Sequence, residues 1–205
     1  MDWRERCDNK LISAQEALKA VRNGDTVQVN WLHATPVTLS EALMARKDEL
    51  RDVKVCTIGP IFNWAQPGAD RAFILQTPYL GVTTRPPMTE GRVEFIPVMY
   101  YRYQELPPGM ECDVYLTPVS PPDKHGYCSF GTGLFMSKTM TAAARVVIAE
   151  DMKILYALAV KITSMCLRSP ISSSRQCRRQ PYRRPRESRK KWQQQKLFAP
   201  WLLTN

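Results

Sequence analysis

The chain has 205 residues and a formal net charge of +10, but the charge is confined to its end: residues 1–150 contain 16 Lys and Arg against 17 Asp and Glu, and residues 151–205 contain 13 against two. Basic charge therefore favours nucleic-acid binding only for residues 151–205. Six cysteines without a CxxC pair and two distant histidines argue against structural zinc, and the lack of an apolar run of about 18 residues argues against a membrane span.

Residues 13–58 alternate between helix and strand signals. Ser13 stands three residues before Glu16, which is the spacing of a capping box at a helix start. Apolar residues then recur at helical spacing, and β-branched runs follow. The predicted elements are a helix at Ala14–Arg22, a strand at Thr26–Trp31, a helix at Val37–Leu50 and a strand at Val53–Ile58.

The middle of the chain is less regular but continues the same alternation. A Pro-rich loop is expected around Arg85, Pro86 and Pro87. The further predicted elements are strands at Phe73–Leu75, Val93–Pro97, Asp113–Pro118, Tyr127–Phe130 and Arg145–Ala149, and a helix at Leu134–Ala144. Short strands that alternate with helices predict an α/β domain with a mainly parallel sheet over residues 1–150.

Residues 151–205 form a divergent basic tail. From Arg168 to Lys196 the chain offers little apolar surface and no helix or strand period, so we expect disorder from about residue 168. The tail has three interpretations: a nucleic-acid arm in which Tyr182 and Trp192 stack on bases, a solvated tail without a partner, and a change of reading frame or aberrant splice near residue 150. The abrupt change of composition favours the third.

The loop Ser120–Gly131 follows a predicted buried strand, where open α/β sheets place their binding sites. Its Pro-Pro pair stiffens the backbone, Asp123 can cap it, and Gly126 permits close approach of another group. His125 titrates near neutrality and could donate to a carboxylate or thioester oxygen. The residues alone favour the simpler interpretation, a polar turn between two strands.

Several segments resemble the acetyl-CoA hydrolase/transferase family, in order and with matching spacing over about residues 8–150. These segments are Leu11–Leu18, Asn23–Asp25, Ala34–Pro36, Glu90–Pro97, Ser120–Gly131 and Ala144–Glu150. The Pro-Pro-Asp-x-His-Gly-Tyr element is the most specific of them, and the resemblance reverses the interpretation of that loop as a mere turn. It implies a CoA-transferase-type α/β fold built from two similar halves, of which this chain matches the N-terminal one.

The resemblance also implies a chemistry. Family members move CoA between an acyl-CoA and a free carboxylate such as acetate, or hydrolyse acetyl-CoA, through a glutamate nucleophile. That glutamate lies in the C-terminal half, for which we find no counterpart here, and Glu150 is not taken as its replacement. The chain alone is therefore expected to be inactive. The substrate-binding residues implied are Asp123, His125, Gly126, Tyr127 and Arg85.

The expected substrates are an acyl-CoA thioester and a small carboxylate, with no bound cofactor or metal, and the expected partner is a homologous CoA-transferase chain. A departure from the family follows Val29, where Asn30-Trp31-Leu32-His33 replaces small glycines and could obstruct a ligand. Two other functions stay open: a regulatory half that pairs with a full-length homologue, and nucleic-acid binding by the tail. The expected compartment is the cytoplasm, with mitochondria as the alternative.

Three further features have two interpretations each. Arg85 and Arg92 could steer CoA phosphates, although solvated surface arginines are commoner. His33 is expected to be a loop residue rather than a base. The aromatic cluster Met99–Tyr103 could stack on adenine, but packing is favoured.

Overall fold

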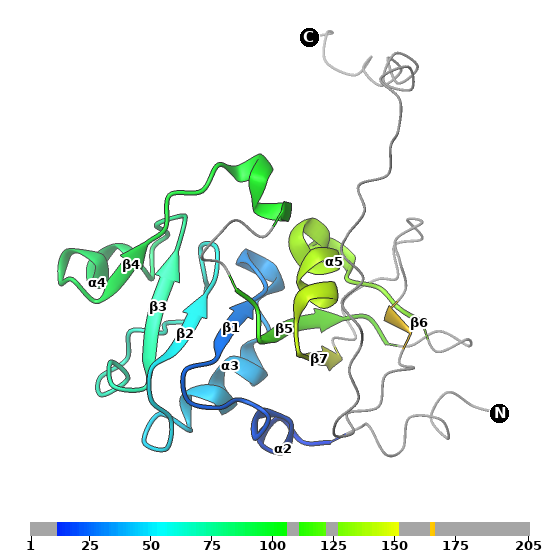
Figure 1. Ribbon diagram of the computed structural model, residues 1–205, viewed down its shortest axis with the longest axis horizontal. Coiled ribbons are helices and arrows are strands. Elements are labelled where there is room, and N and C mark those ends of the chain that lie inside the picture. Colours follow the sequence, from blue (N-terminus) through cyan, green and yellow to red (C-terminus); the bar gives the residue numbers. More distant parts are fainter. Residues whose placement is uncertain (1–11, 106–110, 122–126, 152–164, 167–205) are drawn as a thin grey trace, which may run out of the picture. The chain divides into compact units, whose positions relative to one another are not determined.

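The computed structural model describes residues 12–105, 111–121, 127–151 and 165–166 (Figure 1). The chain divides into two units, residues 1–171 and 172–205, and the second lies wholly outside the described residues. The tail predicted to be disordered from about residue 168 also falls outside them, so both that prediction and the domain boundary at residue 150 stay predictions. All described residues therefore belong to the first unit.

Within the described residues, six parallel strands form one sheet in the order β4-β3-β2-β1-β5-β7, which confirms the predicted parallel α/β architecture. In the centre, Val27 of β1 pairs with Val55 of β2 on one side and with Val114 of β5 on the other. The strands are β1 (Thr26–Val29), β2 (Val53–Cys56), β3 (Phe73–Thr77), β4 (Val93–Phe95), β5 (Val114–Val119) and β7 (Val146–Asp151). A separate antiparallel pair joins β6 (Tyr127–Cys128) to β8 (Met165–Cys166).

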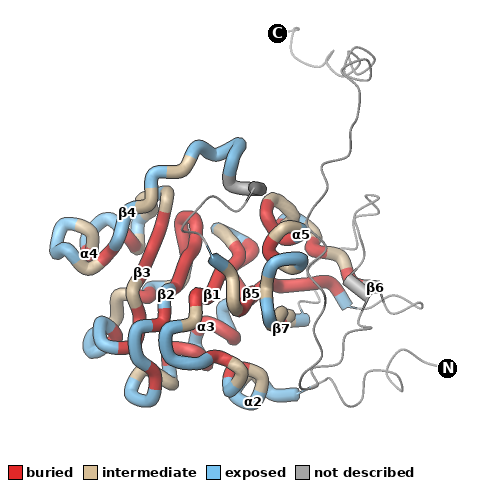
Figure 2. Tube along the Cα trace, in the orientation of Figure 1, coloured by how far each residue is buried: buried red, intermediate tan, exposed pale blue. Residues whose placement is uncertain are grey.

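Helices cover both faces of the sheet, and every residue of β1 and β5 is therefore buried (Figure 2). Alternate side chains of β5 belong to different cores: Val114 and Leu116 pack in the cluster that includes Leu18 and Leu43, whereas Tyr115 packs against Met136 and Met140. The helices are α2 (Ala14–Leu18), α3 (Val37–Met44), α4 (Arg85–Thr89) and α5 (Leu134–Ala143), with 3₁₀ turns η1 (Leu32–Ala34), η2 (Tyr100–Glu105) and η3 (Gly131–Gly133). The sheet thus separates α2 and α3 from α5.

The first helix begins where its cap predicts but ends early. The Ser13 hydroxyl accepts a hydrogen bond from the Glu16 amide at 3.2 Å, which confirms Ser13 as the N-cap. The Glu16 carboxylate pairs with Lys19 at 2.5 Å. α2 ends at Leu18 rather than Arg22, and α3 ends at Met44 rather than Leu50, because the following residues form tighter turns before the next strands.

The prediction of a Pro-rich loop around Arg85, Pro86 and Pro87 is wrong, because these residues form the first turn of α4. Proline is compatible with a first turn, where its missing N–H would have no intrahelical partner and its fixed φ is already helical. Two prolines therefore start a short helix here instead of preventing one.

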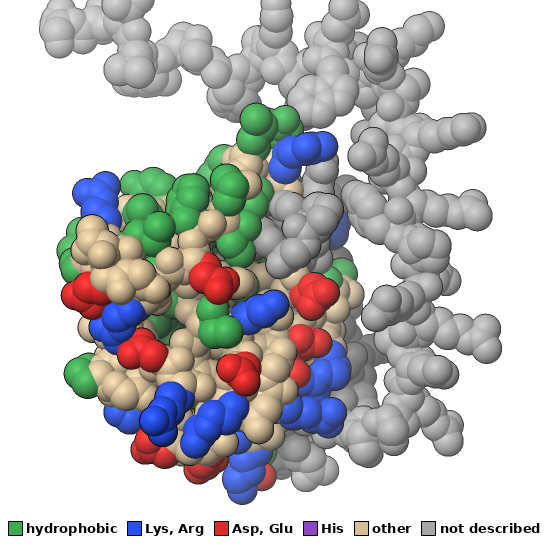
Figure 3. Space-filling view, turned by 60° about the vertical axis from the view of Figure 1, so that its left-hand side comes forward, with side chains coloured by type: hydrophobic (Ala, Val, Ile, Leu, Met, Phe, Trp, Pro, Cys, Tyr) green, Lys and Arg blue, Asp and Glu red, His purple; other side chains and the backbone are tan. Residues whose placement is uncertain are grey.

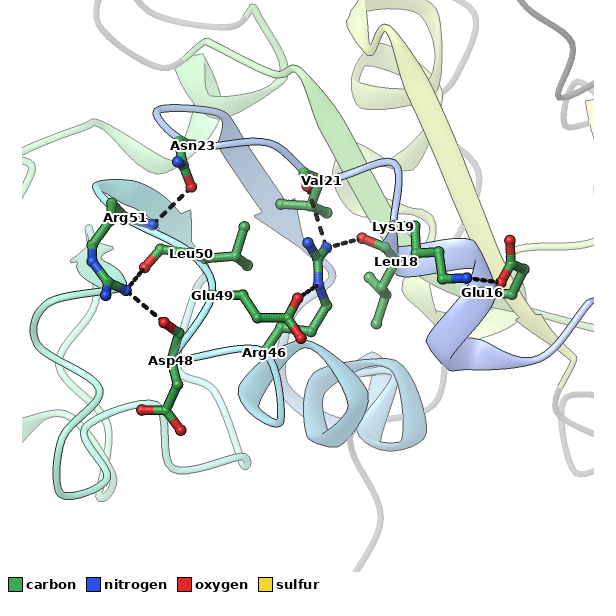
Figure 4. A network of polar contacts seen from close by, with 10 residues as sticks. All are labelled: Glu16, Leu18, Lys19, Val21, Asn23, Arg46, Asp48, Glu49, Leu50 and Arg51. Carbon is green, nitrogen blue, oxygen red and sulfur yellow. Dashed lines mark hydrogen bonds and ion pairs between the residues drawn. The ribbon is translucent and has the colours of Figure 1, made fainter.

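A polar network ties the ends of α2 and α3 together where the chain enters the strands (Figure 4). The Arg46 guanidinium donates to the carbonyls of Leu18 and Val21 and pairs with Glu49 at 3.1 Å. Nearby, the Asn23 side chain accepts a hydrogen bond from the Arg51 amide at 2.9 Å. These contacts lie before β1 and β2, at the amino ends of the strands, and they are structural. Among the helices of the described residues, none has the length and apolar character needed to cross a bilayer.

Candidate functional site

The chain reverses its direction across the sheet between β1 and β5. From β1 the strands are added outward through β2, β3 and β4, and β5 then returns to pair with the free side of β1. The loops that leave β1 and β5 consequently emerge side by side. This topological switch point at the carboxyl ends of the strands is where open α/β sheets bind ligands.

Asn30, the first residue after β1, fixes this switch point. Its buried side-chain amide donates to the Thr117 hydroxyl of β5 at 2.9 Å, to the Ser137 hydroxyl of α5 at 3.1 Å and to the Gly133 carbonyl at 3.1 Å. Its carbonyl oxygen accepts from the Trp31 amide at 2.8 Å. One side chain therefore holds β1, β5 and α5 together and orients the residue that follows it.

The network continues into the core through Tyr115. The phenol of Tyr115 lies 2.7 Å from the Ser137 hydroxyl, and burial raises the pKa of Tyr115 to about 12. Gly133 has no room for a side chain: an added Cβ would lie 2.7 Å from Asn30 Nδ2 and 2.9 Å from Ala34 Cβ. Because the phenol stays neutral and the packing is tight, this cluster is a rigid support and not an acid or base.

Beside the switch point, a pocket of about 250 Å³ opens at the carboxyl edge of the sheet. Each lining residue follows the end of a strand: two follow β1, one follows β2, two follow β3 and two follow β4. They are Trp31, Leu32, Ile58, Pro78, Tyr79, Val98 and Tyr100. Figure 3 shows hydrophobic side chains gathered along the upper rim, the side toward which β1–β3 run in Figure 1, with Lys or Arg side chains at places along it and most charged side chains below.

Leu32, one of the lining residues, has an unusual backbone conformation. Its φ of 43° lies in the left-handed region, which costs a branched L-residue free energy. The Leu32 amide donates to the Ile58 carbonyl at 3.3 Å, and the Leu32 carbonyl accepts from the Thr35 hydroxyl at 2.6 Å. Gly59 leaves room for the Leu32 side chain, because a Cβ added to Gly59 would lie 3.0 Å from Leu32 Cδ2. The loops after β1 and β2 thus hold each other in place.

Aromatic rings form one wall. Tyr100 stacks on Phe135 of α5 with centroids 4.3 Å apart and an interplanar angle of 16°, and Trp31 lies 5.0 Å from the same Phe135 ring. Tyr100 of the Met99–Tyr103 cluster thus packs on α5 with one ring face, but Met99, Tyr100 and Tyr101 are each more than half exposed, so the expected burial is only partial. The Trp31 indole N–H is buried and meets no hydrogen-bond acceptor among the described residues. It is one of the few polar groups among the residues that line the pocket.

The loop after β5 is closed at its base. The Ser120 amide donates to the Ser129 carbonyl at 2.8 Å, and the Ser129 amide donates to the Ser120 hydroxyl at 2.9 Å. Asp123, His125 and Gly126 lie outside the described residues, and Tyr127 is described only as the first residue of β6. Their predicted role in substrate binding stays a prediction. The base of their loop does lie at the carboxyl end of β5, where that prediction requires it.

The arginines differ in their surroundings. Arg85 is exposed at the start of α4, and its Nε donates to the Leu80 carbonyl at 3.2 Å, beside the loop that follows β3. Arg92 is engaged: it pairs with Asp70 at 3.0 Å and with Glu90 at 3.2 Å, and these hydrogen bonds raise its pKa. Arg85 stays a candidate for an anionic group, whereas Arg92 joins segments of the chain.

Glu150 lies near the end of β7, and its carboxylate has a structural partner. Its Oε2 accepts a hydrogen bond from the Leu39 amide at 3.3 Å, in the first turn of α3. Pro36, the N-cap of α3, makes no side-chain capping bond, so Glu150 satisfies an amide that the helix start leaves open. This contact gives Glu150 a structural partner, and the expectation that it is not the nucleophile stays a prediction.

The thiols of Cys56 and Cys112 are not activated either. Burial raises the pKa of Cys56 and of Cys112 to about 12, and the Cys56 thiol donates to the Gln76 side chain at 3.0 Å. A neutral thiol is a poor nucleophile at neutral pH. Within the described ranges, no three His, Cys, Asp or Glu side chains lie close enough together to hold a metal ion.

Sequence reasoning missed most of the pocket. It singled out Trp31 and Leu32 only as an obstruction after Val29, and it did not bring Ile58, Tyr79 or Val98 into the site. The signal was the position of each apolar residue just after a predicted strand, since parallel strands deliver such residues to one edge. That signal does not indicate which of these apolar residues come together in one pocket.

The fold and this edge define an α/β domain of the CoA-transferase type. RipA from Yersinia pestis, a solved structure, matches 75% of this chain with a TM-score of 0.69 and 23% identity, and the match covers 39% of RipA. Residues 1–154 match the acetyl-CoA hydrolase/transferase N-terminal domain. The chain therefore belongs to the acetyl-CoA hydrolase/transferase family.

Two curated relatives carry transferase names. The 4-hydroxybutyrate coenzyme A transferase of Clostridium kluyveri is 32% identical over 155 residues, and the butyryl-CoA:acetate CoA-transferase of Anaerostipes caccae is 31% identical over 161 residues. Each match covers 73% of this chain but only 36% and 35% of the respective relative. The chain thus spans little more than a third of the length of these relatives.

Proposed function

We propose that this domain forms the acyl-binding half of a site that transfers CoA between an acyl-CoA and a small carboxylate such as acetate, or hydrolyses acetyl-CoA. The observation that carries the proposal is the apolar pocket at the carboxyl edge of the sheet, beside the switch point, in a chain of this family. CoA thioester is a substrate here and not a resident cofactor.

Three groups of residues would have separate roles in this chemistry. The pocket lined by Trp31 and Leu32 would bury the acyl group, and burial of apolar surface supplies the binding free energy. The loop carrying Asp123, His125, Gly126 and Tyr127 would meet the thioester or carboxylate oxygens from the β5 side. Arg85, exposed beside the loop after β3, would meet an anionic group of CoA.

The nucleophile is not assigned to this domain. Glu150 accepts a hydrogen bond from the first turn of α3, and the thiols of Cys56 and Cys112 are neutral. By family resemblance a glutamate of the C-terminal half attacks the thioester and forms first a mixed anhydride and then a glutamyl-CoA thioester. A half of that type, on a longer form of this chain or on a homologous partner chain, would supply it.

Acyl-CoA turnover by the purified 205-residue chain tests this division. We expect the chain to bind butyryl-CoA without releasing CoA, with or without acetate, and to support transfer when a CoA-transferase C-terminal half is added. Turnover by the chain alone would contradict the placement of the nucleophile. Glu150→Gln is the matched control, because it keeps the acceptor for Leu39 and removes the carboxylate as a nucleophile.

A regulatory half is the second candidate, and one observation favours it. Apolar side chains are exposed along the same edge, among them Tyr79, Val82 and Tyr101. Such a surface suits cover by a second α/β half. Co-purification with a full-length homologue, without any gain of activity, would favour this function. Nucleic-acid binding depends on residues 168–196, which lie outside the described residues, and stays a prediction.

A further inference from the structure

The lining of the pocket carries no charged side chain. Seven residues surround it, and their polar side-chain groups are limited to the Trp31 indole N–H and the hydroxyls of Tyr79 and Tyr100. A carboxylate or ammonium group that entered would lose its water without meeting an opposite charge, and such burial is strongly unfavourable. The lining therefore discriminates against charged ligand groups and favours hydrocarbon.

The volume of the pocket bounds the size of its occupant. Sites that hold a whole drug-sized ligand measure about 300–1,000 Å³, so a pocket of about 250 Å³ is too small for a CoA molecule. An apolar cavity of about 150 Å³ is large enough to bind benzene. The pocket consequently fits part of a thioester, namely its acyl group, and has room for a chain of about six carbons.

The pocket is held in shape before any ligand arrives. The strained backbone of Leu32 is fixed by hydrogen bonds on both sides, and Gly59 lets the Leu32 side chain lie directly on the loop after β2. Asn30 fixes Trp31 from the other side through its amide. A preformed pocket selects by size and polarity, since it adapts little to a wrong occupant.

We propose that this pocket takes an uncharged acyl chain of about six carbons, and that Trp31, Leu32 and Val98 determine this specificity. The inference rests on the proposed function and makes it more specific: it names medium-chain acyl groups over dicarboxylic ones. The acyl carbons lie among the pocket residues, and the thioester remains at the mouth of the pocket.

A series of ligands measures this preference on the full chain. Titration calorimetry with acetyl-, butyryl-, hexanoyl- and succinyl-CoA should show affinity rising about fourfold per added methylene up to hexanoyl, which corresponds to about 0.8 kcal/mol each. Succinyl-CoA should bind at least about tenfold more weakly than butyryl-CoA, because its terminal carboxylate has no partner in the pocket. Free butyrate and hexanoate are titrated in parallel.

Matched variants locate the effect. Val98→Phe fills the pocket and should abolish the preference for hexanoyl- over butyryl-CoA while leaving acetyl-CoA binding unchanged. Val82→Phe makes the same exchange at a residue that is 89% exposed and outside the pocket, and should change nothing. Leu32→Gly enlarges the pocket and should shift the preferred chain to a longer one. The control for Leu32→Gly is Asp52→Gly, because Asp52 is the other described non-glycine residue with a positive φ.

The outcomes separate this inference from the proposed function. Equal affinity for all chain lengths, or succinyl-CoA bound as tightly as hexanoyl-CoA, would overturn the inference even if CoA transfer is observed. Tight binding of free hexanoate that Val98→Phe removes would support it even if no CoA transfer is found. If Val98→Phe does not fold, the wild-type series decides alone.

Discussion

The carboxylate of Glu150 and the backbone amide of Leu39 lie 3.3 Å apart, although 111 residues separate them in the sequence. The contact joins the end of β7 to the first turn of α3. Glu150 lies near residue 154, the last residue that matches the family. Its carboxylate gives α3 the hydrogen-bond acceptor that Pro36 cannot provide. Glu150 therefore serves as an acceptor for the open amide of Leu39 at the start of α3.

Glu150→Ala should lower the free energy of unfolding by about 1 kcal/mol, the usual cost of losing an N-terminal cap. Glu150→Gln should retain most of that stability, because the amide oxygen still accepts from Leu39. Urea unfolding followed by circular dichroism measures both. Glu41→Ala, on the exposed face of the same helix, serves as the control and should stay within about 0.5 kcal/mol of wild type.

Asn30→Ala should be among the more damaging single changes in the described domain. It removes the amide that joins β1, β5 and α5 and leaves the buried Thr117 hydroxyl without its donor, whereas the Gly133 carbonyl keeps the hydrogen bond from the Ser137 hydroxyl. Each buried group left unsatisfied costs about 1–3 kcal/mol, so we expect a loss of roughly 3 kcal/mol. Asn63→Ala, which removes an exposed turn bond to Ala65, should cost clearly less. Equal losses in the two variants would show that the buried network adds little.

The Leu32→Gly variant should be more stable than the Leu32→Ala variant. This reverses the usual order, in which an alanine variant is more stable than the glycine variant at the same position. Leu32→Ala loses packing and keeps the strain of a φ of 43°, whereas Leu32→Gly loses the same packing and relieves about 1 kcal/mol of that strain. Thermal and urea unfolding of the two variants give the comparison. A Leu32→Gly variant less stable than Leu32→Ala would mean that the left-handed backbone is not adopted in solution.

The stability of the domain should fall at alkaline pH. Burial raises the pKa of Cys56 and Cys112 from 9.0, and of Tyr115 from 10.0, to about 12. Below about pH 8 both folded and unfolded chains keep these protons, and stability is insensitive to them. As the pH rises through 9 and 10 the unfolded chain loses protons that the folded chain retains, and unfolding becomes more favourable.

Urea unfolding in a reducing buffer at pH 7, 8.5 and 10 measures this loss. Cys56→Ser keeps a donor toward Gln76 but removes one titrating group, so its loss between pH 8.5 and 10 should be smaller than that of wild type. Identical profiles for the two proteins would mean that the Cys56 thiol is not buried as described.

Local patterns predicted the strands well and the site only in part. The strands β1, β2 and β5 are visible in the sequence because β1 and β2 alternate β-branched with polar residues and β5 is a mostly apolar run. The start of α4 was missed because Pro86 and Pro87 signal a loop as strongly as a first helical turn. Strand order decides which loops meet, and no local pattern contains that information, so the approach of Val98 and Tyr79 to Trp31 could not be predicted.

The Asn30 network illustrates the same limit. A lone Asn after a strand is a common turn residue, and nothing near it in the sequence indicates Thr117 or Ser137 as partners. The contact arises because β5 returns to the free side of β1. By contrast, Ser13 was predicted as a cap because its partner lies three residues away.

The central claim is that the carboxyl edge of this sheet buries the acyl group of a CoA thioester. Titration calorimetry of the full 205-residue chain with butyryl-CoA and with free CoA tests it most directly. We predict that butyryl-CoA binds at least about tenfold more tightly than CoA, because the pocket buries the acyl methylenes at about 0.8 kcal/mol each. Equal affinity for the two ligands, or no binding of either, would contradict the claim.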